Sequence, residues 1–386
     1  MSTSSRAVPG PPGAALRFVP HLTRRAAAYF DDFGAGPVRV HLRSSSDRRL
    51  SQLHEFELAS GERTHQVLVK VPSGPLGGAS AADVWHGREM RRSSPALESK
   101  SQLEYATLSG MHALFDRLRD PRFGTIRPLE LMRENALVME KVTGSGLSRV
   151  VASSNRLLRR SADAEIGRAF RNAGACLKAW HQLATLSHTQ PRRTTRAEFV
   201  TFIAELASHL THESGDTASF ENARVAACRA AGGVLPPELP LGTSHGDYAP
   251  RNILVGARGQ VTVLDTLGRW KTPIYGDLGN FLFALKATRL QVYTRGLAFT
   301  PSTLAAWERS FLCGYFDQEP VPLAAIRLFE IRALLDKWVS VCRRQRHAAG
   351  LERVREQYRA RAWDRFLRRY LLRLLSDLDE TRPMSV

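Results

Sequence analysis

Apolar and polar positions near the start of the chain follow a pattern that predicts a small antiparallel sheet. Residues 37–42 and 53–60 have the composition of strands, and residues 64–71 form a third, strongly β-prone run. The serine-rich segment 43–51 between the first two runs predicts a hairpin loop. A short helix is expected over residues 20–33, ahead of the strands.

A helix should follow these strands, because apolar side chains recur at helical spacing from Leu103 to Leu118. It is expected over residues 101–119, with two short strands after it around the turn at 133–136. Segment 72–100 consists largely of Gly, Ser, Pro and charged residues and therefore predicts a flexible insertion.

The pattern turns helical beyond about residue 150. Segment 252–266 is the strand-like exception, since it reads as a hairpin that turns at residues 256–259. One helix is marked by apolar residues from Ile166 to Trp180. Further helices are expected at 196–211, 218–231, 280–291, 302–316, 322–346 and 351–378.

Together these elements predict an α+β fold with two lobes. Residues 1–20 are expected to form a flexible tail, residues 21–142 a sheet-rich lobe, and residues 143–386 a helical lobe that includes the hairpin. The 43% hydrophobic content of the 386 residues is enough to support a sizeable core.

Composition argues against secretion, membrane spanning and zinc binding. No apolar run reaches the roughly 18–20 residues that cross a bilayer, and the N-terminus lacks the apolar core of a secretory signal. The four cysteines are widely separated, which predicts buried free thiols in a reducing compartment and thus a cytoplasmic location. The twelve histidines are scattered, so no zinc site is indicated.

The charge is strongly positive, with a formal net value of +18 and 48 arginines against seven lysines. Segment 343–373 alone carries eleven arginines and three acidic residues, a net charge of +8. Such a surface attracts phosphates, anionic membranes or acidic partners. Nucleic acid is disfavoured, because no aromatic and basic recognition motif accompanies the charge.

The same C-terminal segment is amphipathic. Its apolar stripe predicts a helix packed on the helical lobe, and a peripheral contact with an anionic membrane is the alternative. The stripe consists of Leu351, Val354, Tyr358, Trp363, Phe366, Tyr370, Leu374 and Leu378.

Candidate chemistry lies in the segment "SHGDYAPRNILV" and the strand after it. Asp247 precedes Asn252 by five residues, and Asp265 ends the next strand, so a loop and a hairpin can bring the three side chains together. A carboxylate and an amide supply the oxygen ligands that Mg²⁺ prefers, and a further carboxylate can accept a hydroxyl proton. These are the parts that phosphoryl transfer needs.

The sheet-rich lobe offers a matching cation. Lys70 interrupts an apolar strand, where a charge is costly without a partner. Glu104 in the following helix is the expected partner, with Glu98 as its rival. A Lys–Glu pair of this kind would aim an ammonium group at nucleotide phosphates.

The motifs "HGDYAPRN", "LDT" and "IYGDLGNF" resemble the aminoglycoside phosphotransferase family, whose fold is similar to that of protein kinases. The weaker matches "KVPSG", "LEYATLSGMHALF", "ALVMEKVTGSGL" and "AGACLKAWHQL" extend the resemblance to residues 35–290. The resemblance implies ATP and Mg²⁺ as cofactors. It also implies Asp247 as catalytic base, Asn252 and Asp265 as metal ligands, and Lys70, paired with Glu104, as the residue that holds the phosphates. The backbone from Glu140 to Val142 would meet adenine.

Departures from the family pattern shape the expected substrate. A Gly-rich phosphate loop is absent, so Ser45 and Ser46 are taken as replacement phosphate ligands. Only a dozen residues separate Asp265 from Asp277, and this leaves little room for an activation segment or a peptide-docking platform. The expected acceptor is therefore a small molecule, such as a sugar or saccharide-containing compound. The alternatives are an aminoglycoside-type antibiotic, or a catalytically weak nucleotide-binding scaffold recruited through the basic C-terminal helix.

Supporting roles are expected for four further residues. His245 should brace the loop, and Asp277 should cap the helix after it and support the loop. Arg251 could stabilise transferred charge, while His181 reads as a packed histidine at a helix end.

Overall fold

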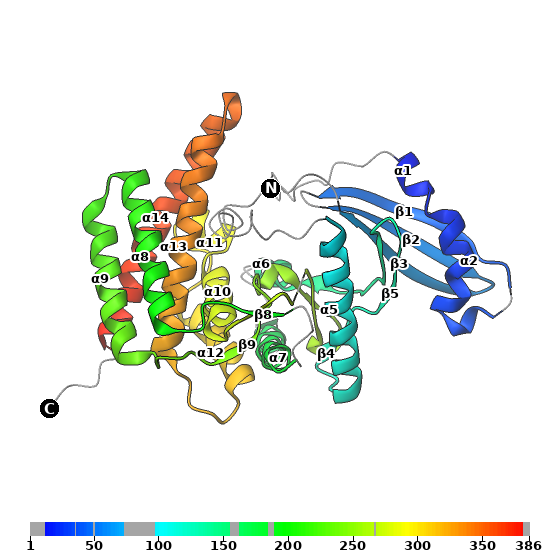
Figure 1. Cartoon of the computed structure of the whole chain (residues 1–386), viewed down its shortest axis with the longest axis horizontal. Coiled ribbons are helices and arrows are strands. Elements are labelled where there is room, and N and C mark those ends of the chain that lie inside the picture. The colour runs from blue at the N-terminus through cyan, green and yellow to red at the C-terminus, as the bar shows by residue number, and fades with distance from the viewer. Residues whose placement is uncertain are drawn as a thin grey trace. The chain divides into compact units, whose positions relative to one another are not determined.

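The computed structural model describes residues 12–34, 36–48, 51–72, 97–154, 162–183, 189–265 and 268–380 (Figure 1). Backbone contacts divide the chain into two units. The sheet unit runs to Thr143 and excludes residues 120–124, which belong with the helical unit that begins at Gly144. Each unit is described separately below.

The sheet unit contains a five-stranded antiparallel sheet in the order β1-β2-β3-β6-β5. The three strands expected from the sequence are therefore neighbours in chain order, and the two short strands around the turn complete the sheet. The strands are β1 (Arg39–Arg48), β2 (Ser51–Ser60), β3 (Arg63–Pro72), β5 (Pro128–Leu131) and β6 (Leu137–Glu140).

Residues 43–48 and Ser51 of the serine-rich segment are strand and not loop, so the expected hairpin loop was wrong for these residues. Ser45 and Ser46 lie in β1, paired with His54 and Leu53 of β2. The Ser45 hydroxyl lies 2.6 Å from Nδ1 of His54. Serine favours turns locally, but here pairing with a long neighbouring strand satisfies the backbone groups and overrides that preference.

Two N-terminal helices, α1 (Pro12–Leu16) and α2 (Val19–Tyr29), cover one face of this sheet (Figure 1). Phe18, between them, is 1% exposed and belongs to the same apolar core as Val67 and Val69 of β3. The predicted flexible tail over residues 1–20 is therefore wrong from residue 12 onward, because these apolar residues complete the core.

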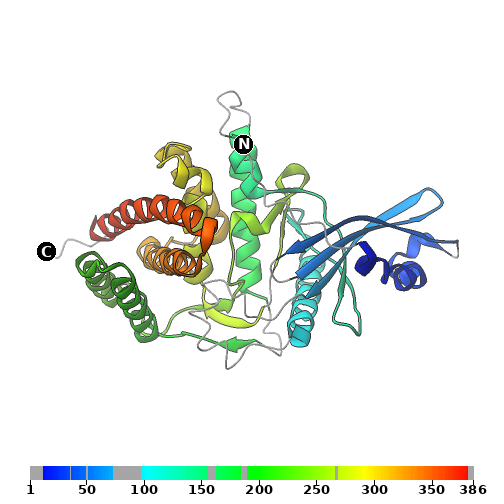
Figure 2. The ribbon, with the colours of Figure 1, turned by 90° about the horizontal axis from the view of Figure 1, so that it is seen from above.

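Helix α5 (Leu97–Leu118) lies by the other face of the sheet. Side chains alternate along a strand, so Lys70 points away from the face that carries Val67 and Val69 and towards α5. Figure 2 shows α5 and the N-terminal helices on different sides of the strands. Most of the predicted insertion, residues 73–96, lies outside the described residues.

The helical unit contains the predicted helices, together with the short helix α6, which was not expected. The helix expected over 280–291 starts earlier and splits, because the Thr288 side chain caps a new short helix by accepting a hydrogen bond from Gln291 N. The helices are α6 (Leu147–Ser154), α7 (Ala162–His181), α8 (Arg196–Ser214), α9 (Thr217–Val234), α10 (Tyr275–Lys286), α11 (Arg289–Tyr293), α12 (Pro301–Phe316), α13 (Leu323–His347) and α14 (Gly350–Glu380).

Two small sheets also lie in the helical unit. The predicted hairpin is present as β10 (Ile253–Val255) and β11 (Val261–Val263). The expectation that it would be the only strand material was wrong. The additional strands are too short to leave a periodic signal; they are β4 (Phe123–Gly124), β7 (Ser145–Gly146), β8 (Gln190–Pro191), β9 (Leu241–Thr243) and β12 (Trp270–Pro273).

A buried ionic network joins four helices of this unit. Lys286 of α10 lies 2.7 Å from Glu308 of α12 and 2.9 Å from Glu330 of α13. Arg327 of α13 contacts both glutamates at 2.6 Å, and the Tyr370 hydroxyl of α14 donates to Glu330. Each buried charge thus has opposite charges beside it.

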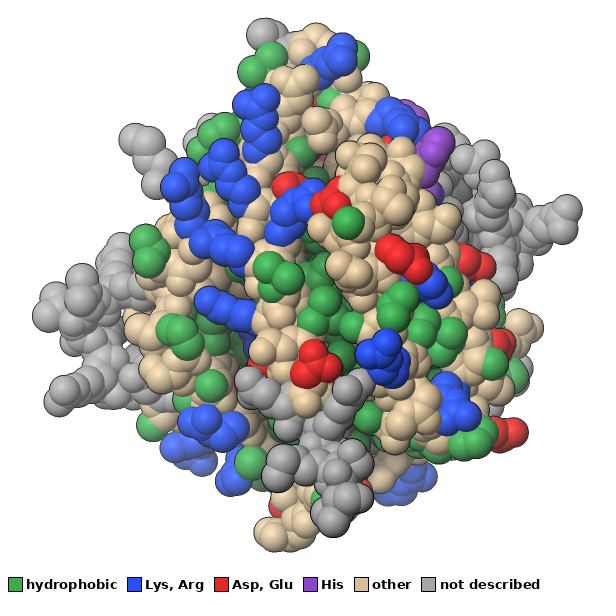
Figure 3. All heavy atoms as spheres, turned by 90° about the vertical axis from the view of Figure 1, so that its left-hand side faces the viewer, with side chains coloured by type: hydrophobic (Ala, Val, Ile, Leu, Met, Phe, Trp, Pro, Cys, Tyr) green, Lys and Arg blue, Asp and Glu red, His purple; other side chains and the backbone are tan. Residues whose placement is uncertain are grey.

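Helix α14 packs on the helical unit from about Ala360 onward. Tyr370 and Leu374 are buried, whereas Val354 and Tyr358 are 65% and 71% exposed. The predicted packing is therefore confirmed for the later part of the stripe. Figure 3 shows the side of the molecule on which α14 lies. Lys and Arg side chains are spread over this face, and Asp and Glu side chains are fewer. No described helix is long and apolar enough to cross a membrane.

The cysteines match the expected free thiols only in part. All four are unpaired, but Cys176 alone is buried, while Cys313 is exposed and Cys228 and Cys342 are half-buried.

Candidate active site

The loop of residues 244–252 joins β9 to β10 and carries the central motif. Its start is held to β12, because the Ser244 amide donates to the Trp270 carbonyl at 2.8 Å. Gly246 has φ +81°, a left-handed backbone conformation that glycine adopts without strain. The turn at Gly246 is followed by Asp247, whose side chain is 51% exposed.

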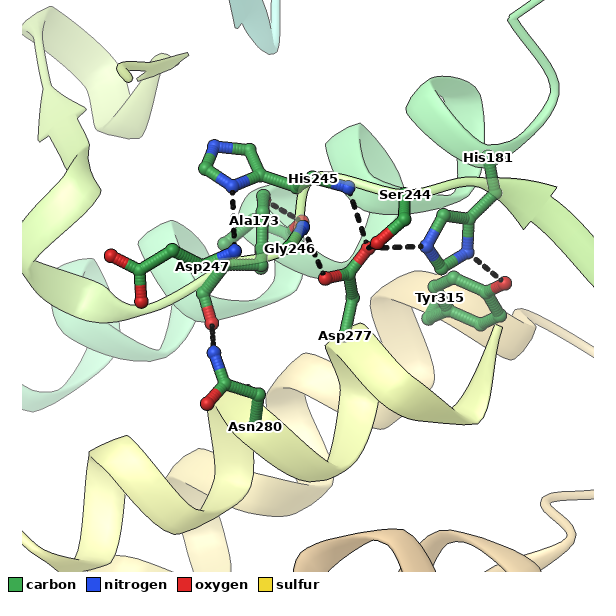
Figure 4. Close-up of polar contacts among 10 residues, drawn as sticks. Ala173, His181, Ser244, His245, Gly246, Asp247, Asp277, Asn280 and Tyr315 are labelled. Atoms are coloured by element: carbon green, nitrogen blue, oxygen red, sulfur yellow. Dashed lines mark hydrogen bonds and ion pairs between the residues drawn. The ribbon is translucent and has the colours of Figure 1, made fainter. Parts of the chain in front are cut away.

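Asp277 holds this loop from behind. It is buried, and its carboxylate accepts hydrogen bonds from His245 N at 2.8 Å and Gly246 N at 2.9 Å (Figure 4). The Ser244 hydroxyl adds a third donor at 3.2 Å. Burial acts to raise the pKa of Asp277, but the hydrogen bond from His181 and the surrounding donors outweigh it and lower the pKa.

The predicted helix cap at Asp277 was wrong, although the predicted support of the loop agrees with these contacts. Helix α10 begins at Tyr275, so Asp277 is its third residue, and Ile274 at the N-cap makes no side-chain cap bond. The carboxylate is directed to the loop because its amides are the nearer unsatisfied donors.

Two histidines complete the support. His181 lies 3.2 Å from Asp277 through Nε2 and 2.7 Å from the Tyr315 hydroxyl through Nδ1, in agreement with a packed helix-end histidine. His245 Nε2 lies 2.9 Å from the Leu264 carbonyl, and its Nδ1 accepts from Asp247 N at 3.3 Å. Burial lowers the pKa of His245, so its ring is neutral and acts as a brace.

The Asp247 carboxylate points away from Asp277 (Figure 4). Asn252 Nδ2 donates to Asp247 Oδ2 at 2.9 Å and to the Asp247 carbonyl at 2.9 Å. The Arg251 guanidinium donates to Asp247 Oδ1. Both carboxylate oxygens are thus oriented by neighbours five and four residues along the chain, as a carboxylate that accepts a proton requires.

Asp265 stands beside this pair at the end of the hairpin. The Leu264 amide donates to the Asn252 carbonyl at 2.8 Å, so Asp265 follows directly on the residue that pairs with Asn252. Asp265 is exposed and has φ +55°, a strained conformation that is enriched at functional sites.

The donor set of Asn252 and Asp265 fits a magnesium ion. It offers one amide oxygen and one carboxylate, and Mg²⁺ commonly takes few protein oxygens beside substrate phosphates. Among the described residues there is no cluster of three or more His, Cys, Asp and Glu, which would instead indicate a fully protein-bound metal.

The sheet unit brings Lys70 and Glu104 together. Lys70 Nζ lies 2.6 Å from Glu104 Oε1, and both side chains line a small hollow with Ser51, Ser101 and Leu137. The Glu98 side chain, considered as a rival, lies outside the described residues.

The segment expected to meet adenine, residues 140–142, begins at the end of β6, the last strand of the sheet in chain order. Glu140 N donates to the Arg127 carbonyl and Lys141 N to the Gln66 carbonyl, both at 2.9 Å. Val142 is half-buried and lies just beyond the strand. These two amides already donate within the sheet unit, so a bound base would have to form its hydrogen bonds with other groups.

One contributor to the site had not been identified from the sequence. Asn280 Nδ2 donates to the Tyr248 carbonyl at 3.1 Å, one turn along α10 from Asp277, so the signal was the spacing of three residues in "DLGN".

Comparison with known proteins identifies the class. The model of the phosphotransferase enzyme family (APH) matches residues 77–307, more than half of the chain. The chain therefore belongs to this family, and it is a phosphotransferase acting on hydroxyl groups of small molecules. No curated protein matches the sequence significantly.

Solved structures confirm the predicted protein-kinase-like α+β fold. A putative aminoglycoside phosphotransferase from Ralstonia eutropha JMP134 is 15% identical with a TM-score of 0.51, covering 91% of this chain and 98% of its own. A glucosamine kinase in complex with glucosamine, ADP and inorganic phosphate is 17% identical with a TM-score of 0.51, covering 97% and 88%.

Proposed function

We propose that the protein transfers the γ-phosphoryl group of ATP to a hydroxyl group of a sugar or saccharide-containing compound. The observation that carries this proposal is the grouping of Asp247, Asn252 and Asp265 on a loop and hairpin. A glucosamine kinase solved with ADP has a similar fold and supports ATP as the donor. Membership of an enzyme family favours transfer over a scaffold role.

In the proposed step the acceptor oxygen forms a bond to the γ-phosphorus while the bond from that phosphorus to the β,γ-bridging oxygen breaks. ADP leaves, and the hydroxyl proton passes to Asp247. Asn252 holds the receiving carboxylate in place, and Arg251 supplies positive charge next to it.

Asn252 and Asp265 would hold Mg²⁺, which when bound supplies charge neutralisation for the phosphates. Lys70 would hold nucleotide phosphates, with its ammonium oriented by Glu104. Asp277 acts through the loop, since it contacts the backbone of His245 and Gly246 and not the reacting groups.

The test is Asp247→Asn in the full chain, assayed for ADP formation with a panel of sugars, nucleosides and aminoglycosides. We expect kcat to fall by about 10²–10⁴-fold, because removal of a general base has this effect. Binding of a fluorescent ATP analogue should persist.

Asp379→Asn, an exposed residue of α14, is the matched control and should retain activity. Unchanged turnover in Asp247→Asn would contradict the proposal.

A further inference from the structure

Helix α14 presents a row of exposed side chains along one of its sides. Residues three or four positions apart lie on the same side of a helix, and six residues of α14 follow this spacing in succession. All six are exposed, and the apolar members Val354, Tyr358 and Leu372 are 65%, 71% and 68% exposed. We call this set the outer row; it consists of Val354, Tyr358, Arg361, Arg365, Arg369 and Leu372.

A different side of α14 holds the helix on the protein. Leu367, Tyr370, Leu371 and Leu374 are buried there. A helix on a protein surface normally turns polar residues to solvent once its apolar side is covered. The apolar residues of the outer row therefore have no part in the packing of α14. Single exposed apolar residues are common, but these three share one row with three arginines.

The arginines of the outer row carry charge that the fold does not balance. Within the part of the chain that the structure describes, no carboxylate forms an ion pair with Arg361, Arg365 or Arg369. The Arg369 guanidinium donates to the Arg365 carbonyl at 3.4 Å, a contact that leaves both charges in place. The face of the molecule in Figure 3, on which α14 lies, is also rich in Lys and Arg side chains.

The acidic side chains within the span of the row, and the one just before it, do not neutralise it. Glu356 pairs with Arg359, and Asp364 pairs with Arg368. Glu352 lies two positions before the start of the row, which places it on the opposite side of the helix. The positive charge of the outer row is therefore available to a partner outside the protein.

Helix α11, which contacts α14, has a similar surface. It contains no acidic residue, and Tyr293 at its end and Leu297 just after it are 42% and 87% exposed. The first acidic residue on the side of the outer row is Asp379, two turns beyond Leu372. Exposed apolar groups and unbalanced arginines thus occur together on two neighbouring elements.

The shape of the outer row favours a flat partner. Val354 and Leu372 are 18 residues apart, which corresponds to about 27 Å along a continuous helix. The side of a helix is convex and offers no groove to a peptide. A bilayer surface is flat, carries lipid phosphates and accepts apolar side chains below its head groups. Arginine suits this boundary, because its alkyl stem can lie in the apolar layer while the guanidinium stays among the phosphates.

We propose that the outer row of α14 binds the surface of an anionic membrane, with its three arginines at the lipid phosphates and its three apolar side chains inserted between the head groups. A nucleic acid would also attract the arginines, but exposed Val354 and Leu372 gain nothing from a phosphate backbone and do gain from a bilayer. The proposal goes beyond the proposed function and is independent of it, since membrane binding requires no phosphoryl transfer.

The experiment measures sedimentation of the full chain with vesicles of phosphatidylcholine alone and of equal parts phosphatidylcholine and phosphatidylglycerol. We expect binding to the anionic vesicles only, and weaker binding as the salt concentration rises. The triple variant Arg361→Gln, Arg365→Gln, Arg369→Gln should bind about 10²-fold more weakly, since each arginine near an anionic surface contributes about fivefold. Each single substitution, expected to cost about fivefold, provides a second measurement.

The apolar part of the row is tested separately. Tyr358→Ser and Leu372→Ser keep the charge of the protein but remove apolar surface that would enter the bilayer. Each should weaken binding to the anionic vesicles about tenfold. Unchanged binding in both variants would overturn the insertion of these side chains and with it the proposed mode of binding.

A second triple variant is the matched control. Arg168→Gln, Arg171→Gln and Arg309→Gln remove three exposed arginines of α7 and α12 and give the same net charge as the first triple. Binding should stay within about twofold of the parent, because a membrane held at α14 does not contact these residues. Equal losses in the two triples would show that overall charge attracts the protein and would overturn the proposal. No sedimentation with anionic vesicles, or equal binding to both kinds of vesicle, would also overturn it.

Two further measurements complete the test. The urea unfolding midpoint of the outer-row triple should match that of the parent, because the three side chains are exposed. Gel-shift assays with duplex DNA and RNA examine the other class of partner. Nucleic-acid binding that the outer-row triple abolishes, without vesicle binding by the parent, would overturn the membrane proposal.

Discussion

Two groups of cations in the helical unit differ in how their charge is balanced. Lys286 and Arg327 are buried against Glu308 and Glu330, so each cation has carboxylates within 3 Å. Around Lys337 of α13 the charges of Arg344, Arg251 and Arg289 lower the lysine pKa and that of Asp247 raises it, and the buried Asp336 also interacts with Lys337. The first group has the direct ion pairs expected of a structural network, whereas the cation of the second is destabilised by burial and by neighbouring positive charge.

The pKa directions follow this difference. Burial raises the pKa of Glu330, but the charges of Lys286 and Arg327 outweigh it and the pKa falls. For Lys337, burial and neighbouring cations act together, and the pKa falls to about 8. The network stabilises the charged form of Glu330, whereas the surroundings of Lys337 destabilise the charged form of this lysine.

The largest expected effect is on the network. Glu330→Ala should lower the free energy of unfolding by about 3–5 kcal/mol, because it leaves Lys286 and Arg327 without one of their buried partners. Urea unfolding followed by circular dichroism measures this change. Glu319→Ala removes the 65% exposed partner of Lys178 and should cost about 1 kcal/mol or less. Equal losses in the two variants would show that the network is not the stabilising element inferred here.

A smaller effect is expected at Asp277, which supports the 244–252 loop. In the parent protein the Asp277 carboxylate accepts hydrogen bonds from two loop amides and one hydroxyl. Asp277→Asn should therefore lower kcat about 10²-fold. The ATP KM should change little, because the contacts of Asp277 are with the loop and with His181 and not with the proposed nucleotide-binding residues. A larger change in KM than in kcat would contradict a positioning role.

The pH dependence gives an independent readout for Asp277. Its folded-state pKa is lowered, so it contributes stability above its ordinary pKa that is lost as the pH falls. Unfolding curves of the parent and Asp277→Asn should therefore converge towards acid pH.

The smallest expected effect concerns stability at Lys337. Its folded-state pKa of about 8 lies below the ordinary 10.5, so the unfolded chain binds more protons between these values and stability rises with pH there. Lys337→Met should remove this rise and stabilise the fold at pH 7 by about 1 kcal/mol. Lys178→Met, at an exposed ion pair, should show no such gain. Destabilisation by Lys337→Met at pH 7 would place Lys337 with the structural network.

The candidate site could be predicted from the sequence where its residues are close in the chain or lie on regular elements. Asp247, Asn252 and Asp265 are separated by a short loop and one hairpin, so their spacing alone brings them together. Lys70 and Glu104 lie on a strand and the next helix, and their ion pair was expected.

Other contacts could not be predicted because they depend on long-range pairing. Ser45 and Ser46 carry a local preference for turns, and only the neighbouring strand draws them into the sheet. The contact of Asp277 with the loop spans about thirty residues, and the same carboxylate could equally have capped its own helix.

The amino-acid sequence by itself determined the fold class, the order of strands and helices, and the motif that marks the chain as a phosphotransferase. These depend on periodicity and short spacings, which the local chain geometry converts directly into structure. The tertiary structure alone decided which of the many arginines have acidic partners. Charge balance is a property of proximity in space, so α10, α12 and α13 had to pack together before Lys286 and Arg327 could be seen beside Glu308 and Glu330.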